Sequence, residues 1–483
     1  MTEATVDVAP PPRHVCDMRN AAESSGPSFF VKERTLFVAL ALVAVYFLVW
    51  PLYRAFYLVE IMPNEGWNAY FQDAAVHGGT LYPPAAALIL NNDPPLSFYA
   101  VGWLGSLFGN SLFAGRALSI VALFGTAAAI GGIVRQLGGA RSSAILGGLC
   151  FIAVMTAAFH RFIGTNEPQL VTAFLMASAL AWFLSSVTHG RAPEPALLLM
   201  VLAGFFKYSA AAIPITAVAW MFLSGYAKAW RATAVAVAGA FAGLAVCYAA
   251  FGADVLTNLL WSRNYSFWKM LDGIHKLQWV AVPLVVWAIW AWQCRKTKAA
   301  KFTGLYVLVA LVAYMAAFGG DGVIDTAQFD LIIASSVAFA IAYDRFGETA
   351  QARRTGVARC RAVIILALLL RLALNQRYES AAILTSADYR AQFPAAEGMF
   401  RSEAQKVAAM PGDVACRFKL VCWAAGKPFA ADDYKIRQIL DRPHLDEDEL
   451  QGFLSRHGVA YARNSPGVSA EALRRDIFAS MAR

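Results

Sequence analysis

The chain has 483 residues, of which 58% are hydrophobic and 15% are charged. Soluble domains carry about 25% charged residues, so a chain of this composition is expected to be solvated largely by lipid. Its formal net charge of +9 would suit a nucleic-acid partner, but the basic residues lie in short loops between apolar runs and form no stripe with interleaved aromatics. That distribution is typical of multi-pass membrane proteins, and we expect no nucleic-acid partner.

Residues 1–34 contain a proline run and a Ser/Gly stretch, and they are predicted to form a disordered cytoplasmic tail. A transmembrane region is predicted for residues 35–374, because a helix of about 20 apolar residues spans a bilayer. About eleven runs are apolar enough to cross as helices: 35–53, 113–134, 142–159, 170–187, 196–206, 209–223, 232–251, 279–292, 302–318, 331–343 and 362–374. The first run is expected to remain in the membrane as an anchor.

Lys and Arg are distributed unequally between two alternating sets of loops. None occurs at residues 55–115 or 319–331, whereas the opposite loops are basic. Those loops hold Arg13, Arg19, Lys32 and Arg34, then Arg135 and Arg141, Arg191, Lys228 and Arg231, the residues from Arg295 to Lys301, and those from Arg345 to Arg361. Since basic loops remain in the cytoplasm, we predict a multi-pass protein of the bacterial inner membrane with a cytoplasmic N-terminus and, after eleven spans, a periplasmic C-terminus.

Two segments on the predicted periplasmic side are long. Residues 55–112 are broken by two Pro-Pro pairs and are predicted to form helices in the membrane interface, with a twelfth span within them as the alternative. Residues 375–483 are richer in charge, and we predict a small soluble α/β domain there. Its cysteines, Cys416 and Cys422, could form a disulfide across a tight turn or stay reduced, and the spacing leaves both open.

The first periplasmic segment carries Glu60, Glu65, Asp73 and Asp93 without any Lys or Arg to neutralise them. Carboxylates held near lipid are costly to ionise, so their concentration here indicates a function. The alternative to a functional site is a solvated loop with an aromatic belt at the membrane interface, and composition alone favours this alternative. The order of motifs along the chain changes that preference.

Five short motifs occur in a defined order. They are Asn64-Glu65 after the first span, Asn91-Asn92-Asp93-Pro94-Pro95-Leu96-Ser97-Phe98-Tyr99, Phe108-Gly109 followed by Gly115-Arg116, Asn166-Glu167-Pro168, and Phe206-Lys207 with Pro214 downstream. Together they resemble the GT-C glycosyltransferases, in particular the branch of the protein O-mannosyltransferases and lipid A aminoarabinose transferases. The resemblance covers roughly residues 35–225 and continues more weakly to about 345. It implies a GT-C-like membrane domain that transfers a sugar from a polyprenyl-phosphate donor, with inversion, on the outer face of the membrane.

The chain departs from the family at one important position. The resemblance implies an Asp-Glu pair whose Asp is the catalytic base, and this chain has Asn64-Glu65. An amide cannot accept a proton near neutral pH, so the general base is predicted to be Glu65 or Asp93, with Glu65 preferred. Asn64 also raises the alternative of a catalytically inactive relative that binds lipid-linked sugar.

The family chemistry also requires cations that stabilise the phosphate leaving with the polyprenyl carrier. Lys207 interrupts an apolar stretch, and such lysines usually face a cavity. Arg116, at the outer end of the second span, and Arg263 are the other predicted ligands of the donor phosphate. Both arginines could instead anchor helices in the headgroup region.

Four further side chains are predicted to assist the acceptor, the sugar or a metal ion: Glu167, Asn64, His160 and Asp325. Glu167 could bind a divalent cation together with Glu65, and a salt bridge to Arg161 is the alternative. Asp325 belongs to an acidic loop that could hold sugar hydroxyls or form a solvated turn. No cofactor is expected to be required, and the sequence has no zinc-ligand spacing, Walker loop or dinucleotide fingerprint.

We therefore predict a membrane glycosyltransferase with a carboxylate base. Its partners would be a polyprenyl-phosphate-linked sugar, membrane lipids and an envelope glycan, lipid or protein acceptor. The alternative from another class is a transporter or flippase of lipid-linked sugar. That alternative would explain the spans and Lys207, but neither the acidic first loop nor the C-terminal domain.

Overall fold

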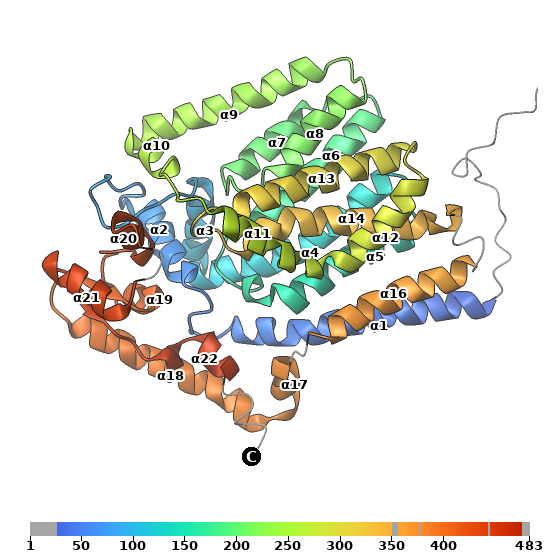
Figure 1. Cartoon of the computed structure of the whole chain (residues 1–483). Helices are drawn as coiled ribbons and strands as arrows, with labels where there is room; N and C mark the ends of the chain where they lie inside the picture. The colour runs from blue at the N-terminus through green and yellow to red at the C-terminus, as the bar shows by residue number, and fades with distance from the viewer. Residues whose placement is uncertain (1–26, 350–355, 376–377, 443–444, 476–483) are drawn as a thin grey trace, which may run out of the picture.

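The computed structural model describes residues 27–349, 356–375, 378–442 and 445–475, and most of them are helical (Figure 1). Seven helical stretches of the described residues are long and apolar enough to cross a membrane: Arg34–Arg54 within α1 (Pro27–Arg54), α4 (Ser111–Gln136), α5 (Arg141–Ala158), α6 (Gln169–Thr188), α9 (Ala229–Phe251), α13 (Lys298–Phe318), and Asp325–Glu348, which contains α14 (Phe329–Arg345). An eighth span would be α11 (Phe267–Lys276) with α12 (Ala281–Gln293), which are bent by 81° at a short break. Helix α1 begins inside the predicted tail, of which residues 1–26 lie outside the described residues.

The other predicted spans are also helical, but shorter. Helices α7 (Glu194–Gly204) and α8 (Ala212–Leu223) have 11 and 12 residues, and α16 (Val357–Ala373) packs against α1. Each predicted apolar run therefore falls on a helix, while seven helices, or eight with the bent pair, have the length and composition of a span. The chain is a multi-pass membrane protein, and the count of eleven spans stays a prediction.

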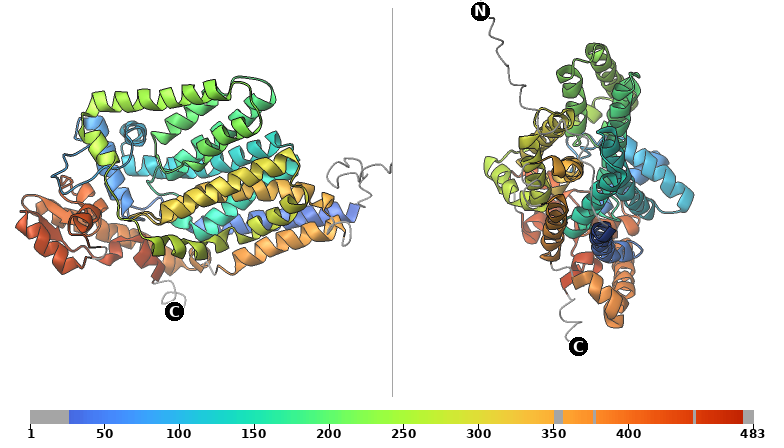
Figure 2. Two further views of the ribbon diagram at one scale, coloured as in Figure 1. Left: turned by 45° about the horizontal axis from the view of Figure 1, so that its top comes forward. Right: turned by 90° about the vertical axis from the view of Figure 1, so that its right-hand side faces the viewer.

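The centre of the bundle is α14, whose side chains are buried along almost its whole length. It packs against α5, α12 and α13, and α4 packs against α5 and α6. Figures 1 and 2 show the long helices side by side, with α9 at one edge. Small residues allow this close approach, since a Cβ at Gly148 would lie 2.8 Å from the carbonyl oxygen of Ala127. Helices in lipid associate mainly through such close packing.

The loops of the bundle gather at two opposite ends. At one end α2 (Asn64–His77), α3 (Leu96–Phe108) and α10 (Asp254–Leu259) lie with the C-terminal part of the chain, on the left of Figure 1. At the other end two of the predicted basic loops meet, because Arg345 donates to the carbonyl oxygen of Leu137 at 3.2 Å and the N–H of Ala140 donates to Asp344 at 3.1 Å. This segregation agrees with the alternation of loops in the sequence. Which end faces the cytoplasm stays a prediction.

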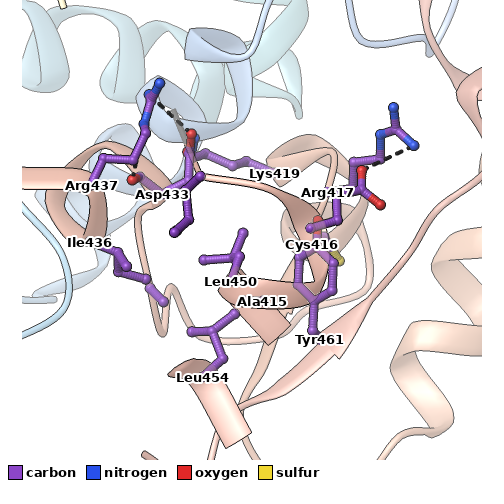
Figure 3. Close-up of a pocket in the computed structure, with 13 residues that line it drawn as sticks. Ala415, Cys416, Arg417, Lys419, Asp433, Ile436, Arg437, Leu450, Leu454 and Tyr461 are labelled. Carbon is purple, nitrogen blue, oxygen red and sulfur yellow. Dashed lines mark hydrogen bonds and ion pairs between the residues drawn. The ribbon is translucent and has the colours of Figure 1, made fainter. Parts of the chain in front are cut away.

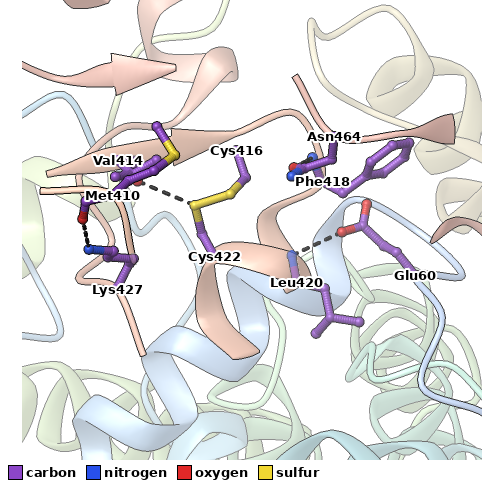
Figure 4. The surroundings of a disulfide bond; sticks show 9 residues. All are labelled: Glu60, Met410, Val414, Cys416, Phe418, Leu420, Cys422, Lys427 and Asn464. Atoms are coloured by element: carbon purple, nitrogen blue, oxygen red, sulfur yellow. Dashed lines mark hydrogen bonds between the residues drawn. A yellow bond between two sulfur atoms is a disulfide. The ribbon is translucent and has the colours of Figure 1, made fainter. Parts of the chain in front are cut away.

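Residues 378–475, the C-terminal segment, combine short helices with a small sheet. The helices are α17 (Tyr378–Thr385), α18 (Ala387–Ala409), α19 (Lys419–Ala424), α20 (Asp433–Ile439), α21 (Glu447–Arg456) and α22 (Ala470–Arg475). The sheet pairs β1 (Val414–Cys416) in parallel with β2 (Ala460–Ala462). Cys416 and Cys422 form a disulfide with their Cα atoms 5.7 Å apart, so the structure has the first of the two predicted alternatives (Figure 4). Helices and strands are both present, and the existence of a separate domain stays a prediction.

The C-terminal segment is fixed to the loop between α1 and α4. The buried carboxylate of Glu60 accepts the backbone N–H of Leu420 at 3.0 Å (Figure 4), and Trp423 Nε1 donates to Asp73 at 2.7 Å. Gly66 lets the two parts touch, because a Cβ at this position would lie 2.3 Å from the backbone nitrogen of Leu420. These contacts hold the C-terminal segment against the loop that carries the first predicted site residues.

Candidate active site

A cavity of about 700 Å³ lies at the end of the bundle that carries the C-terminal segment. Its walls come from parts of the chain that are far apart in sequence. They include Asn64, Trp67 and Asp93, then Arg161, Glu167, Lys207 and Tyr208, then Arg263 and Lys269, and finally Lys419, Asp432, Asp433, Tyr434 and Arg437. The structure thus brings five predicted site residues together around one space: Asn64, Asp93, Glu167, Lys207 and Arg263.

Lys207 is the centre of an acidic cluster in this cavity. Its Nζ pairs with Glu167 and lies 3.4 Å from a carboxylate oxygen of Asp93. Burial lowers the pKa of the Lys207 ammonium, but the two carboxylates outweigh burial and the net pKa is raised. Asn64 Nδ2 donates to the other oxygen of Glu167 at 3.2 Å. Glu167 is therefore held by two partners, Lys207 and Asn64. Asp93 has a longer contact with Lys207, and its side chain lines the cavity.

Two other cations of the cavity have no carboxylate partner among the described residues. Arg263 donates to the hydroxyl of Tyr208 at 3.2 Å, and Lys269 Nζ donates to the carbonyl oxygens of Gly320 at 2.7 Å and Val323 at 3.2 Å. Lys269 is not among the site residues predicted from the sequence, and the structure places it in the lining of the cavity. Arg263 and Lys269 can together stabilise an anion that enters from outside.

The C-terminal segment supplies a charged wall of the cavity. Lys419 contacts both Asp432, at 3.3 Å, and Asp433, which also accepts from Arg437 at 3.2 Å. Burial raises the pKa of Asp432 to about 6. Burial acts in the same direction on Asp433, but Lys419 and Arg437 outweigh it and lower its pKa to about 2. Sequence reasoning missed this wall, because nothing near residues 419–437 indicates that they fold back over the first loop.

Glu65 and Arg116, both predicted site residues, bind each other outside the cavity lining. Their ion pair is 2.7 Å long, with side chains 0% and 2% exposed. The Glu65 carboxylate also accepts the N–H groups of Ile61 at 2.8 Å and Asn166 at 3.0 Å. Arg116 donates as well to the backbone carbonyl oxygens of Ala55, Tyr57 and Val59. The pair clamps the loop after α1 against α4, and this geometry favours a structural role for both residues.

The remaining predicted residues lie beside the cavity or away from it. His160 is buried against the ring of Trp50, at a centroid distance of 5.6 Å, and its carbonyl oxygen accepts from Arg54 at 2.8 Å. Asp325 pairs with Arg161, a cavity residue, and with Lys276. Within residues 27–475, apart from the undescribed gaps, no group of three or more His, Cys, Asp or Glu is arranged to hold a metal ion.

A second cavity, of about 210 Å³, lies within the C-terminal segment (Figure 3). Ile436, Leu450 and Leu454 supply apolar lining. Lys419, Asp433 and Arg437, which are labelled in Figure 3, line this cavity as well as the larger one, so the two spaces share a charged wall.

Comparison with protein families gives a match over a third of the chain. Residues 92–251 match the family described as dolichyl-phosphate-mannose-protein mannosyltransferase. The matched part contains Asp93, Glu167 and Lys207, the acidic cluster of the cavity. No curated protein matches the sequence significantly.

Solved structures share the fold of nearly the whole chain. ArnT from Cupriavidus metallidurans bound to undecaprenyl phosphate is 17% identical, with a TM-score of 0.54 over 87% of this chain and 90% of that chain. The same protein in the apo state is 16% identical, with a TM-score of 0.55 over 91% and 94%. The oligosaccharyltransferase AglB from Archaeoglobus fulgidus, in complex with an inhibitory peptide and a dolichol-phosphate, is 11% identical, with a TM-score of 0.52 over 83% and 64%. At these identities the likeness concerns the fold.

Proposed function

We propose, from the GT-C-like fold and the matched segment, that the chain is a GT-C glycosyltransferase that transfers a sugar from a polyprenyl-phosphate donor to an envelope acceptor. The observation that carries the proposal is the composition of the large cavity. One wall presents the carboxylate of Asp93, and Arg263 and Lys269 supply positive charge from side chains that form no ion pair within the described residues. Two solved structures of similar fold hold undecaprenyl phosphate or dolichol-phosphate, which supports a lipid phosphate as the carrier.

In the proposed reaction a hydroxyl of the acceptor attacks the anomeric carbon of the sugar from the face opposite the phosphate. The new C–O bond forms as the bond between the anomeric carbon and the phosphate oxygen breaks, and the electron pair remains on the phosphate. Arg263 and Lys269 stabilise this developing charge. Asp93 accepts the proton of the hydroxyl, while Lys207 fixes the position of Asp93. Attack from the opposite face inverts the anomeric configuration.

We prefer Asp93 to Glu65 as the base, because the Glu65 carboxylate is occupied by Arg116 and two backbone N–H groups. The sequence predicts Lys207 as a ligand of the donor phosphate, whereas the proposed mechanism assigns it to holding Asp93 in position. The proposed chemistry uses only side chains of this chain and needs no cofactor. We place it on the periplasmic face of a bacterial inner membrane, with an envelope glycan, lipid or protein as acceptor.

The proposal can be tested with the full chain in nanodiscs. Undecaprenyl phosphate serves as the probe for binding, and a panel of undecaprenyl-phosphate hexoses serves as donors for turnover. The double variant Arg263→Gln/Lys269→Gln should bind undecaprenyl phosphate at least tenfold more weakly, since a hydrogen bond to a charged group contributes about 1.5–3 kcal/mol. Lys406→Gln, which removes an exposed cation paired with Glu403, is the matched control and should bind as the wild type does.

The fate of the donor distinguishes a glycosyltransferase from a transporter and from an inactive relative. Release of undecaprenyl phosphate with the sugar attached to an acceptor or to water supports the proposal. Movement of intact donor between leaflets of a liposome, without cleavage, would indicate the transporter alternative. Donor binding without cleavage or movement would indicate an inactive relative.

A further inference from the structure

The end of the bundle opposite the active-site cavity contains a separate pocket of about 280 Å³. It is lined by the last residues of α4, α6 and α14, by the start of α13 and by Trp220 of α8. Lys298 and Arg345 supply the charge of its lining, and no Asp or Glu is among the described residues that form it. The pocket is therefore cationic.

The two cations are available to a ligand. Arg345 is oriented by a neutral group, the carbonyl oxygen of Leu137, to which it donates at 3.2 Å. Its neighbour Asp344 accepts from Ser143 at 3.0 Å and from the N–H of Ala140 at 3.1 Å. Lys298, at the first position of α13, is exposed and forms no ion pair within the described part of the chain. An anion entering the pocket would meet two positive charges that form no ion pair with a described carboxylate.

The rest of the lining selects a ligand with an apolar portion. Leu184 and Val187 of α6 contribute apolar surface, and Trp220 is 5% exposed, with its ring fixed edge-on against Phe302 at 5.2 Å. An inorganic anion would leave this surface in contact with water. A phosphate ester that carries a hydrocarbon chain matches both kinds of lining.

The position of the pocket indicates which kind of phosphate ester, a membrane lipid or a soluble compound, would reach it. Helices α4, α6, α13 and α14 can each cross a membrane, and the pocket lies where all four reach the same end of the bundle. Lipid headgroups are concentrated at that level, and basic residues there attract anionic lipids. We propose that this pocket binds the phosphate headgroup of an anionic phospholipid. The site is distinct from the active-site cavity and does not depend on the sugar-transfer reaction.

The test measures binding of short-chain dihexanoyl phosphatidylglycerol to the full chain in neutral detergent, with dihexanoyl phosphatidylcholine for comparison. The double variant Lys298→Gln/Arg345→Gln should bind phosphatidylglycerol roughly 25-fold more weakly, about fivefold for each charge near a membrane surface. Arg141→Gln/Lys301→Gln removes two charges from the same end of the bundle but outside the pocket, and it should change binding less than twofold. Thr188→Trp keeps all charges and obstructs the pocket, so it should also weaken binding if the charge variant does not fold.

Three results would overturn the proposal. Equal weakening in the pocket variant and its control would show that diffuse surface charge attracts the lipid. Equal affinity for phosphatidylcholine would remove the role of the anionic headgroup. Competition by inorganic phosphate at the same concentration as the lipid would assign the pocket to a soluble phosphate ligand.

Discussion

Glu65→Gln is expected to lower the free energy of unfolding, and to leave the turnover of each folded molecule largely unchanged. The pair of Glu65 with Arg116 is buried, with side-chain exposures of 0% and 2% and a separation of 2.7 Å. Removing one partner of such a pair leaves an uncompensated charge in the interior, at a cost of about 3–5 kcal/mol. The Gln carbonyl can still accept one backbone N–H, from Ile61 or Asn166, so the lower end of that range, roughly 3 kcal/mol, is expected.

The assay compares unfolding free energy with turnover per folded molecule. Arg116→Met should be similarly unstable, and the double variant should lose less than the sum of the two single variants, because each removes the same ion pair. Asp93→Asn is the contrasting variant. It should keep near-normal stability, since Lys207 retains Glu167 as a partner, and should lower turnover by about 10²–10⁴-fold.

One pattern of results would refute this reasoning. If Glu65→Gln were as stable as the wild type and had lost turnover, while Asp93→Asn remained active, Glu65 would be the base. The clamp role of its pair with Arg116 would then be wrong.

Four other predictions concern the surroundings of the site. Gly66→Ala should detach the C-terminal segment from the first loop, because the added Cβ would lie 2.3 Å from the Leu420 nitrogen, and protease cleavage within residues 410–430 should increase. Burial raises the pKa of Glu60 to about 8 from an ordinary 4.5, although the Leu420 N–H acts in the opposite direction, so burying Glu60 under the C-terminal segment costs least below pH 4.5 and most once the pH has risen through 8. After correction for the intrinsic exchange rate, which itself rises with pH, the protection of the α19 amides should therefore fall between pH 6 and pH 9, and Glu60→Gln should remove this fall. Asn64→Asp should raise turnover if the chain lost activity at that position, and leave it unchanged or lower if Asp93 is the base. Single cysteines at positions 80, 320 and 440 should be labelled from outside the cell and those at 140 and 297 should not, and outside labelling at 297 would reverse the topology.

The helices were predictable because the apolar runs specify them directly. A run of about 20 lipid-compatible residues has few alternatives to a helix, and even the short runs at 196–206 and 209–223 lie on α7 and α8. Span number was harder to predict, since the break between α11 and α12, with its 81° bend, depends on how the two helices pack. The start of α1 at Pro27 also extends into a segment whose composition indicated disorder.

The site could be predicted only in part. Asp93 and Lys207 stand out because each is a charge within an apolar or proline-bounded motif, and both line the cavity. The pairing of Glu65 with Arg116 joins residues 51 positions apart, and the sequence does not specify the direction of either side chain. Lys419 and its partners reach the cavity from the far end of the chain. Their role follows from the tertiary fold, which local sequence patterns do not reveal.

The most direct test of the central claim is a structure of the full chain with undecaprenyl phosphate bound. We predict that the phosphate lies in the large cavity, within hydrogen-bond distance of Arg263 or Lys269, with Asp93 facing the position that the sugar would occupy. A phosphate bound outside this cavity, in contact with neither cation, would contradict the proposed donor site and the mechanism built on it.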